Sequence, residues 1–228
     1  MRTKVFDTPE AAARGAAEQI ERWLAAAVSD RGRASVAFSG GRSPTPMFDA
    51  LAKAELSWRQ IDVFQADERV AAADSPTRNL TGLNAHLIGP AGIPQDNLHA
   101  MPVELAGPDA AADTYAATLT AILGDPPVLD VLHLGMGADG HTASLIPGDP
   151  SLTVDDRLVV LTGLYQGTRR LSLAFDVLNR ARHVVFLVTG ADKQAAVARL
   201  LARDTSIPAG RVRQEHAFLC LDRAALPE

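Results

Sequence analysis

Short runs of β-branched and other apolar residues alternate with alanine-rich segments of helical spacing along this chain of 228 residues. Such alternation is typical of βαβ units, in which helices flank a largely parallel sheet. Because the runs are apolar at nearly every position, we expect strands that are buried on both faces. The predicted strands are Ser35–Phe38, Ile61–Ala66, Leu129–Leu134, Leu158–Leu161, Arg170–Phe175, His183–Val188 and His216–Leu221.

Helical patterns lie between these runs. Thr8 can cap a helix whose first residue is Pro9, since a threonine hydroxyl accepts one of the backbone N–H groups that the first turn leaves free. We find no internal repeat and no interdomain linker. The sequence therefore predicts one α/β domain over residues 1–228, with a modified Rossmann-like sheet flanked by helices. The predicted apolar helix faces are Ile20, Trp23, Leu24, Ala27 and Val28; Met47, Phe48 and Leu51; Ala112, Tyr115, Ala116, Leu119, Ile122 and Leu123; and Val197, Leu200 and Leu201.

The charge balance narrows the possible partners. A formal net charge of −5 gives little attraction to nucleic acid or to an anionic membrane, although basic side chains can still converge on a small anion. Cys220 is the only cysteine, which excludes an intrachain disulfide and fits a reducing cytoplasm. The first residues lack the apolar core of a secretion signal, and no apolar run is long enough to cross a bilayer. We expect a cytoplasmic monomer or small homo-oligomer.

Three glycines, Gly135, Gly137 and Gly140, have the spacing of a dinucleotide-binding fingerprint and follow an apolar run. The surrounding residues argue against that function. Asp139 would face the phosphates with like charge, and Pro147 would break the helix that has to follow the last glycine. The next predicted strand also lacks the carboxylate that should close it. We therefore expect a flexible glycine turn without a bound dinucleotide.

The same turn carries Asp139 and His141 two positions apart. In an extended segment both side chains project to the same side, so the carboxylate could orient the imidazole as a general base. Alternatively, Asp139 caps a following helical turn and His141 is a partly buried, hydrogen-bonded residue. The Asp-x-His pattern by itself leaves both interpretations open.

A second glycine turn, Ser39-Gly40-Gly41-Arg42-Ser43, follows the first predicted strand and precedes a helix. Glycines let backbone N–H groups approach an anion, and the arginine and serine side chains add donors. The segment could be a phosphate cradle or only a tight turn that needs positive φ. It is not a Walker loop, because no Gly-Lys-Ser/Thr follows at the required spacing.

Charged residues end the second predicted strand, where Asp67, Glu68 and Arg69 are adjacent. Ligands of open α/β sheets bind at the carboxyl ends of the strands. This position favours a functional role over the alternative, which is a set of solvated loop charges.

Taken together and in this order, these segments resemble the 6-phosphogluconolactonase family, which is grouped with glucosamine-6-phosphate deaminases and ribose-5-phosphate isomerases. The resemblance extends over nearly the whole chain, and the long Gly-x-Gly-x-Asp-Gly-His-Thr-Ala-Ser-Leu run is its most specific part. The matching segments are FSGGRSPTPMFDAL (38–51), WRQIDVFQADERV (58–70), DVLHLGMGADGHTASLIPG (130–148), RRLSLAF (169–175), LNRARHVVFLVTGADK (178–193) and HAFLCLD (216–222).

The resemblance implies hydrolysis of 6-phosphoglucono-δ-lactone without a metal or a cofactor. In that interpretation His141 is the general base, Asp139 orients it, and Asp67 lines the sugar pocket, while Asn79 contacts the substrate. Backbone amides of the 137–140 turn are candidates for stabilising the oxyanion. The residues expected to hold the phosphate are Ser39, Gly40, Gly41, Arg42, Arg69, Arg170 and Lys193.

Two alternative functions and one departure from the family pattern remain. In the glucosamine-6-phosphate deaminase branch a glutamate precedes the proline after the Asp-Gly-His turn, but this chain has Ile146 there, which favours the lactonase. A sugar-phosphate-sensing module without turnover would not need His141 and Asp67, and both are present.

Arg78, which stands where the family usually has serine before Asn79, is either an extra phosphate contact or a surface residue.

Overall fold

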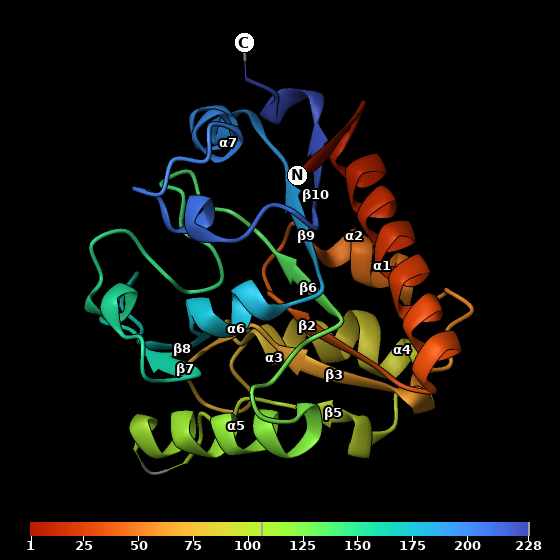
Figure 1. Ribbon diagram of the computed structural model, residues 1–228, viewed down its shortest axis with the longest axis vertical. Coiled ribbons are helices and arrows are strands. Elements are labelled where there is room, and N and C mark those ends of the chain that lie inside the picture. The colour runs from red at the N-terminus through yellow and green to blue at the C-terminus, as the bar shows by residue number, and fades with distance from the viewer. Residues whose placement is uncertain (106, 228) are drawn as a thin grey trace.

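The computed structural model describes residues 1–105 and 107–227, with a seven-stranded sheet through its centre (Figure 1). The strand order is β1-β10-β9-β6-β2-β3-β5, and every neighbouring pair is parallel. The predicted α/β class with a largely parallel sheet is therefore confirmed. The strands of this sheet are β1 (Arg2–Phe6), β2 (Ala34–Phe38), β3 (Ile61–Gln65), β5 (Leu98–His99), β6 (Val131–Leu134), β9 (His183–Val188) and β10 (Ala217–Asp222).

Helices cover both faces of the sheet, with α1 and α2 on one side and α5, α6 and α7 on the other (Figure 1). Along β2, Val36 and Phe38 pack into the core beneath α1, whereas Ala37 packs into the opposite core. Successive side chains of a strand point to opposite faces, so the continuously apolar strands require a layer on each side. The helices are α1 (Pro9–Arg31), α2 (Thr45–Leu51), α3 (Asn79–Leu83), α4 (Gly89–Ala91), α5 (Pro108–Leu123), α6 (Phe175–Arg180) and α7 (Gln194–Leu201), with a π-helical segment at Asn84–Ile88.

The long N-terminal helix begins as the sequence predicts. The Thr8 Oγ1 atom accepts the backbone N–H of Ala11 at 3.1 Å, and Pro9 is the first helical residue. Gly32 ends the helix at φ +74°, a left-handed conformation that glycine adopts at little cost. Although α1 has 23 residues, neither it nor another helix in the described part of the chain is apolar enough to span a membrane.

A small antiparallel sheet corrects the prediction for two strands. Its order is β4-β8-β7, from β4 (Asp67–Arg69), β8 (Arg170–Leu173) and β7 (Val159–Leu161). The segments predicted at 158–161 and 170–175 were assigned to the parallel sheet, and this was wrong. Only eight residues separate β7 from β8. A parallel connection needs about a dozen or more residues, so these two strands can pair only as a hairpin.

Strands β1 and β5 were missed because they lack the apolar runs that mark the others. Residues 2–5 of β1 are exposed at the sheet edge, where polar side chains are tolerated, and β5 has only two residues. The Asp-Glu-Arg segment is also not the end of β3, which stops at Gln65, but a strand of the small sheet. Consequently its three side chains alternate between two environments.

Candidate active site

A cavity of about 230 Å³ opens at the carboxyl edge of the parallel sheet. The turns after β2 and β6 line it with the end of β9, and strands β4 and β8 of the small sheet supply a further wall. This is the crevice where ligands of open α/β sheets bind. Asp139 is the one predicted site residue that does not line the cavity. Ten of the eleven do: Ser39, Gly40, Gly41, Arg42, Asp67, Arg69, Asn79, His141, Arg170 and Lys193.

The turn after β6 holds a carboxylate against an imidazole. Asp139 Oδ1 lies 2.6 Å from His141 Nδ1 and also accepts the His141 backbone N–H at 3.1 Å. No helix follows within residues 139–149, so Asp139 caps none, and the helix that a dinucleotide site needs at Gly140 is absent from this described stretch. With Nδ1 engaged, Nε2 is the nitrogen that remains to act on a ligand.

Glycine at position 137 allows this contact. A Cβ there would lie 2.1 Å from His141 Nδ1 and 2.4 Å from Asp139 Oδ1, so any side chain would push the pair apart. Gly140 adopts φ +83°, where residues with side chains are strained. Gly137 and Gly140 are therefore needed for the turn to pack around His141.

Asp139 is an anion at neutral pH. Partial burial acts to raise the pKa of its carboxyl group, but the backbone N–H and the imidazole of His141 outweigh burial, and the pKa lies below its ordinary value. A charged carboxylate fixes the proton of a neutral imidazole on Nδ1 and stabilises the imidazolium form when Nε2 takes up a proton.

The turn after β2 presents donors without internal partners. Gly41 has φ +113°, and a Cβ on Gly40 would lie 2.3 Å from Asn79 Oδ1, so both glycines are required by geometry. Arg42 is exposed and lines the cavity, and Ser39 Oγ is buried with no hydrogen-bond partner in residues 1–105 and 107–227. These features suit a loop that closes around an anion.

Two arginines lie opposite each other on neighbouring strands of the small sheet. Arg69 and Arg170 are directly opposite in the antiparallel register, and both line the cavity. Burial and the neighbouring Arg69 charge lower the pKa of Arg170, which remains a cation. Like charges directly opposite are destabilising, so this pair favours an anion between or beside them. Lys193 adds a third cation, whose Nζ lies 3.0 Å from Asp192 Oδ2.

Asp67 lies on the same face of β4 as Arg69. Its side chain is buried, and Oδ2 accepts a hydrogen bond from the Ser144 hydroxyl at 2.7 Å. The Asn79 amide donates to the Asp67 backbone carbonyl at 2.8 Å, which fixes Asn79 at the cavity wall. Ser144 was not predicted, although it lies in the long motif three residues after His141.

Buried polar atoms without a hydrogen-bond partner concentrate around this cavity. Of the ten such side-chain atoms in the described residues, six belong to residues that line it. An unpartnered buried polar atom costs roughly 1–3 kcal/mol, so the concentration marks where a polar ligand binds. The six atoms are Ser39 Oγ, Arg69 Nε, Asn79 Oδ1, His133 Nδ1, His133 Nε2 and Arg170 Nε.

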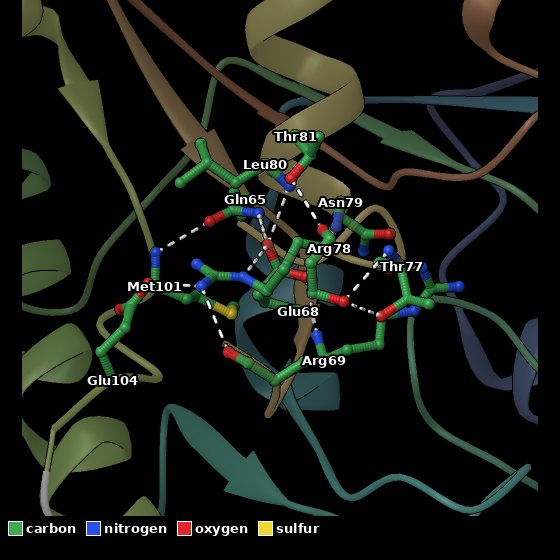
Figure 2. Close-up of polar contacts among 12 residues, drawn as sticks. Gln65, Glu68, Arg69, Thr77, Arg78, Asn79, Leu80, Thr81, Met101 and Glu104 are labelled. Carbon is green, nitrogen blue, oxygen red and sulfur yellow. Dashed lines mark hydrogen bonds and ion pairs between the residues drawn. The ribbon is translucent and has the colours of Figure 1, made fainter. Parts of the chain in front are cut away.

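Glu68 does not line the cavity, and its carboxylate accepts four hydrogen bonds (Figure 2). It also forms an ion pair at 3.2 Å with Arg78, which pairs in turn with Glu104. Arg78 is buried, so it is not the surface residue that the sequence left as one alternative, and its guanidinium pairs with two carboxylates. The donors to the Glu68 carboxylate are Gln65 Nε2 (2.8 Å), the Arg69 backbone N–H (2.7 Å), the Asn79 backbone N–H (2.7 Å) and the Leu80 backbone N–H (2.8 Å).

The proposed oxyanion amides are partly unavailable. The Gly137 N–H donates to the His141 carbonyl at 2.9 Å, and the Gly140 N–H donates to the Gly137 carbonyl at 3.0 Å. Both bonds close the turn around His141. These two amides therefore cannot serve a ligand in this conformation, and that part of the sequence prediction needs correction.

Two further residues near the cavity were missed by sequence reasoning. His133 lies in β6 beneath the cavity, where burial lowers its pKa to about 3, so it is neutral at physiological pH. A histidine inside an apolar strand was the available signal. Tyr165, in the loop between β7 and β8, contacts His141 with ring centroids 5.5 Å apart, and nothing in the sequence pattern indicated it.

Metal-ligating side chains do not cluster at the cavity. Within residues 1–105 and 107–227, no group of three or more histidine, cysteine, aspartate or glutamate side chains could hold a metal ion. The cavity residues themselves offer proton transfer by an imidazole and binding of an anion by arginine, lysine and backbone donors.

Comparison with known proteins identifies the family. The model of the glucosamine-6-phosphate isomerases/6-phosphogluconolactonase family matches residues 7–220. The chain belongs to this family. A family member from Synechocystis sp., a 6-phosphogluconolactonase, is 42% identical over 180 residues, which cover 77% of this chain and 75% of that protein.

Two further similarities extend along nearly the whole chain. The 6-phosphogluconolactonase of Nostoc sp. is 35% identical over 209 residues, covering 89% of this chain and 87% of that protein. The crystal structure of the Thermotoga maritima 6-phosphogluconolactonase aligns with a TM-score of 0.86 at 27% identity, covering 97% of this chain and 98% of that one. The shared fold includes both sheets that border the cavity.

Proposed function

We propose that this protein hydrolyses 6-phospho-D-glucono-1,5-lactone to 6-phospho-D-gluconate, a step of the oxidative pentose phosphate pathway. One observation carries the proposal: an imidazole, 2.6 Å from a carboxylate, lines the same cavity as two opposed arginines. The names of the relatives supply the substrate. The cavity supplies a general base and an anion site for that substrate.

Hydrolysis begins with a water molecule beside His141. The Nε2 atom takes a proton from the water as its oxygen attacks the lactone carbonyl carbon, and Asp139 stabilises the resulting imidazolium. The tetrahedral intermediate then expels the ring oxygen, and the imidazolium returns the proton to it. The product is an open-chain acid with a free hydroxyl group, and His141 is neutral again.

The phosphate is held away from His141 by the two opposed arginines and the Ser39–Gly41 turn. Arginine offers planar, bidentate contacts to phosphate, and Lys193 and Arg42 add charge. Their binding energy orients the lactone carbonyl toward Nε2 and lowers the entropy cost of the attack. Asp67 and Asn79 contact the sugar hydroxyls from the wall formed by β4 and α3.

Deamination of glucosamine 6-phosphate is the second candidate, because the same family includes that activity. Amine loss and ring opening require a further acid/base group. The position where that branch has a glutamate is here Ile146, which is buried and apolar. This observation favours the lactonase.

The decisive assay follows opening of the phosphorylated lactone, corrected for spontaneous hydrolysis, in parallel with ammonia release from glucosamine 6-phosphate. We expect fast lactone hydrolysis that a chelator does not reduce, and no ammonia release. Ammonia release without lactone hydrolysis would reject the proposal in favour of the deaminase. Loss of activity with chelator would reject the metal-free mechanism.

A further inference from the structure

The loop between β7 and β8 is a tight hairpin with a fixed end. Tyr165 and Thr168 exchange backbone hydrogen bonds at 3.1 and 3.2 Å. Between them, Gln166 and Gly167 have φ values of +52° and +79°, which is the pattern of a two-residue turn that matches the twist of paired strands. The turn therefore holds Tyr165 in a defined position at the end of the small sheet.

Tyr165 contacts both halves of the proposed site without lining the cavity. Its ring packs edge-on against His141, with centroids 5.5 Å apart and an interplanar angle of 66°. The Arg170 guanidinium carbon lies 4.9 Å from the centroid of the same ring. The adjacent Gln166 Oε1 accepts from Arg170 Nη2 at 3.4 Å. One ring thus lies against the base and against a phosphate-binding cation.

Partial burial and the negative charge of the nearby Asp139 carboxylate raise the pKa of Tyr165, so its hydroxyl keeps its proton at physiological pH. The ring that packs against His141 and Arg170 is therefore uncharged.

We propose that Tyr165 is a positioning residue that couples the Asp139–His141 pair to Arg170, so that the base and the phosphate anchor keep a fixed separation. The proposal rests on the proposed function, because it assigns these groups to proton transfer and to phosphate binding. The ring restrains Arg170 and His141. The effect of a substitution should therefore follow loss of the ring and not loss of the hydroxyl.

Two substitutions separate the ring from the hydroxyl. Tyr165→Phe keeps the ring, so kcat and KM should both stay within about twofold of native. Tyr165→Leu removes the ring, so KM should rise about fivefold to tenfold and kcat should fall by a similar factor, since an aromatic or cation–π contact of this kind contributes that order. Leu164→Ala is the matched control, because Leu164 is 76% exposed on the same hairpin.

Native-like kcat and KM in Tyr165→Leu would overturn the proposal, as would an equal effect of Leu164→Ala. If Tyr165→Leu does not fold, Tyr165→Met, which also removes the ring, takes its place. A second measurement does not depend on lactone hydrolysis: the imidazole ¹H–¹⁵N resonances of His141 should shift when the ring is removed and should not shift in Leu164→Ala. If native protein fails to hydrolyse the lactone but this shift occurs, the proposed function fails while the contact holds. An unchanged resonance in an active enzyme rejects the positioning role alone.

Discussion

Glu68 and Asp139 are both carboxylates near the carboxyl edge of the main sheet, but their surroundings differ. Glu68 is completely buried and accepts four hydrogen bonds in addition to its ion pair with Arg78. Asp139 has a side chain that is 40% exposed, and the hydrogen bonds to it in the described residues come from His141 alone. A carboxylate with all its acceptor sites filled fixes the chain, whereas one with a single titratable partner can support proton transfer.

The residues on the two faces of β4 differ in the same way. Glu68 lies on the other face, where its hydrogen-bonded carboxylate fixes the start of α3 through the backbone N–H groups of Asn79 and Leu80. Asp67 and Arg69 face the cavity, where buried polar atoms lack partners. Stability is therefore concentrated on one face of the strand and binding capacity on the other, and substitutions on each face should have different consequences.

The largest effect is expected on the cavity side. His141→Ala should lower kcat for lactone hydrolysis by about 10²–10⁴-fold, the usual contribution of a general base. The thermal midpoint of unfolding should change little, since His141 is at a cavity wall. Steady-state kinetics and a melting curve on the same sample test both. Near-normal turnover by a folded variant would remove His141 from the mechanism.

The next effect should be on stability. Glu68→Gln leaves Arg78 without its fully buried counter-ion and turns amide hydrogens toward backbone donors, so the free energy of unfolding should fall by about 3–5 kcal/mol. Glu104→Gln is the matched control, because Glu104 pairs with the same arginine but its side chain is 47% exposed. Glu104→Gln should lower the free energy of unfolding by less than about 1 kcal/mol. Equal losses in urea denaturation would contradict the contrast between saturated and exposed carboxylates.

A smaller effect is expected for phosphate binding. Arg170→Gln should raise KM about tenfold or more with kcat nearly unchanged, since a charge-assisted hydrogen bond contributes about 1.5–3 kcal/mol. Arg169→Gln, at the adjacent exposed position, should leave KM unchanged. If both variants behave alike in steady-state kinetics, Arg170 contributes only general surface charge.

The smallest effect is expected for His133. Its side chain is buried, as that of Glu68 is, but its two ring nitrogens have no hydrogen-bond partner in the described residues. Its pKa is about 3 in the folded protein and about 6.5 in an unfolded chain, so the unfolded state binds more protons in between. Its contribution to stability is full above pH 6.5 and is lost as pH falls toward 3. His133→Leu should therefore reduce the acid destabilisation at pH 5 by about 1–2 kcal/mol, measured by urea denaturation at pH 7 and pH 5. An unchanged difference between the two pH values would show that His133 stays solvated or partnered.

Sequence reasoning predicted the parallel sheet because continuous apolar runs leave few alternatives. The set of site residues came from the family resemblance, which named Asp67 and not Glu68. The pattern of three adjacent charges alone did not separate these two residues, since that requires knowing that β4 is a separate strand. The eight-residue connection between β7 and β8 contained the information for the small sheet and was overlooked. Arg78 also pairs with Glu104, 26 residues away, and local sequence carries no sign of that contact.

The contact between Tyr165 and His141 is non-local in the same way. It depends on a two-residue turn placing one ring near a loop that follows a different strand. The use of the Gly137 and Gly140 amides within their own turn likewise follows from backbone geometry that residue identity does not specify. The fold class and the location of the site followed from the local sequence pattern. The hydrogen-bond partners of individual side chains depended on tertiary contacts.

The most direct test is a crystal structure of the protein with 6-phosphogluconate, the product of the proposed reaction. We predict the phosphate beside Arg69, Arg170 and the Ser39–Gly41 turn, and the new carboxylate within hydrogen-bond distance of His141 Nε2, about 2.6–3.2 Å, or linked to it by one water. A product bound outside this cavity, or with its phosphate against His141 and its carboxylate at the arginines, would contradict the account.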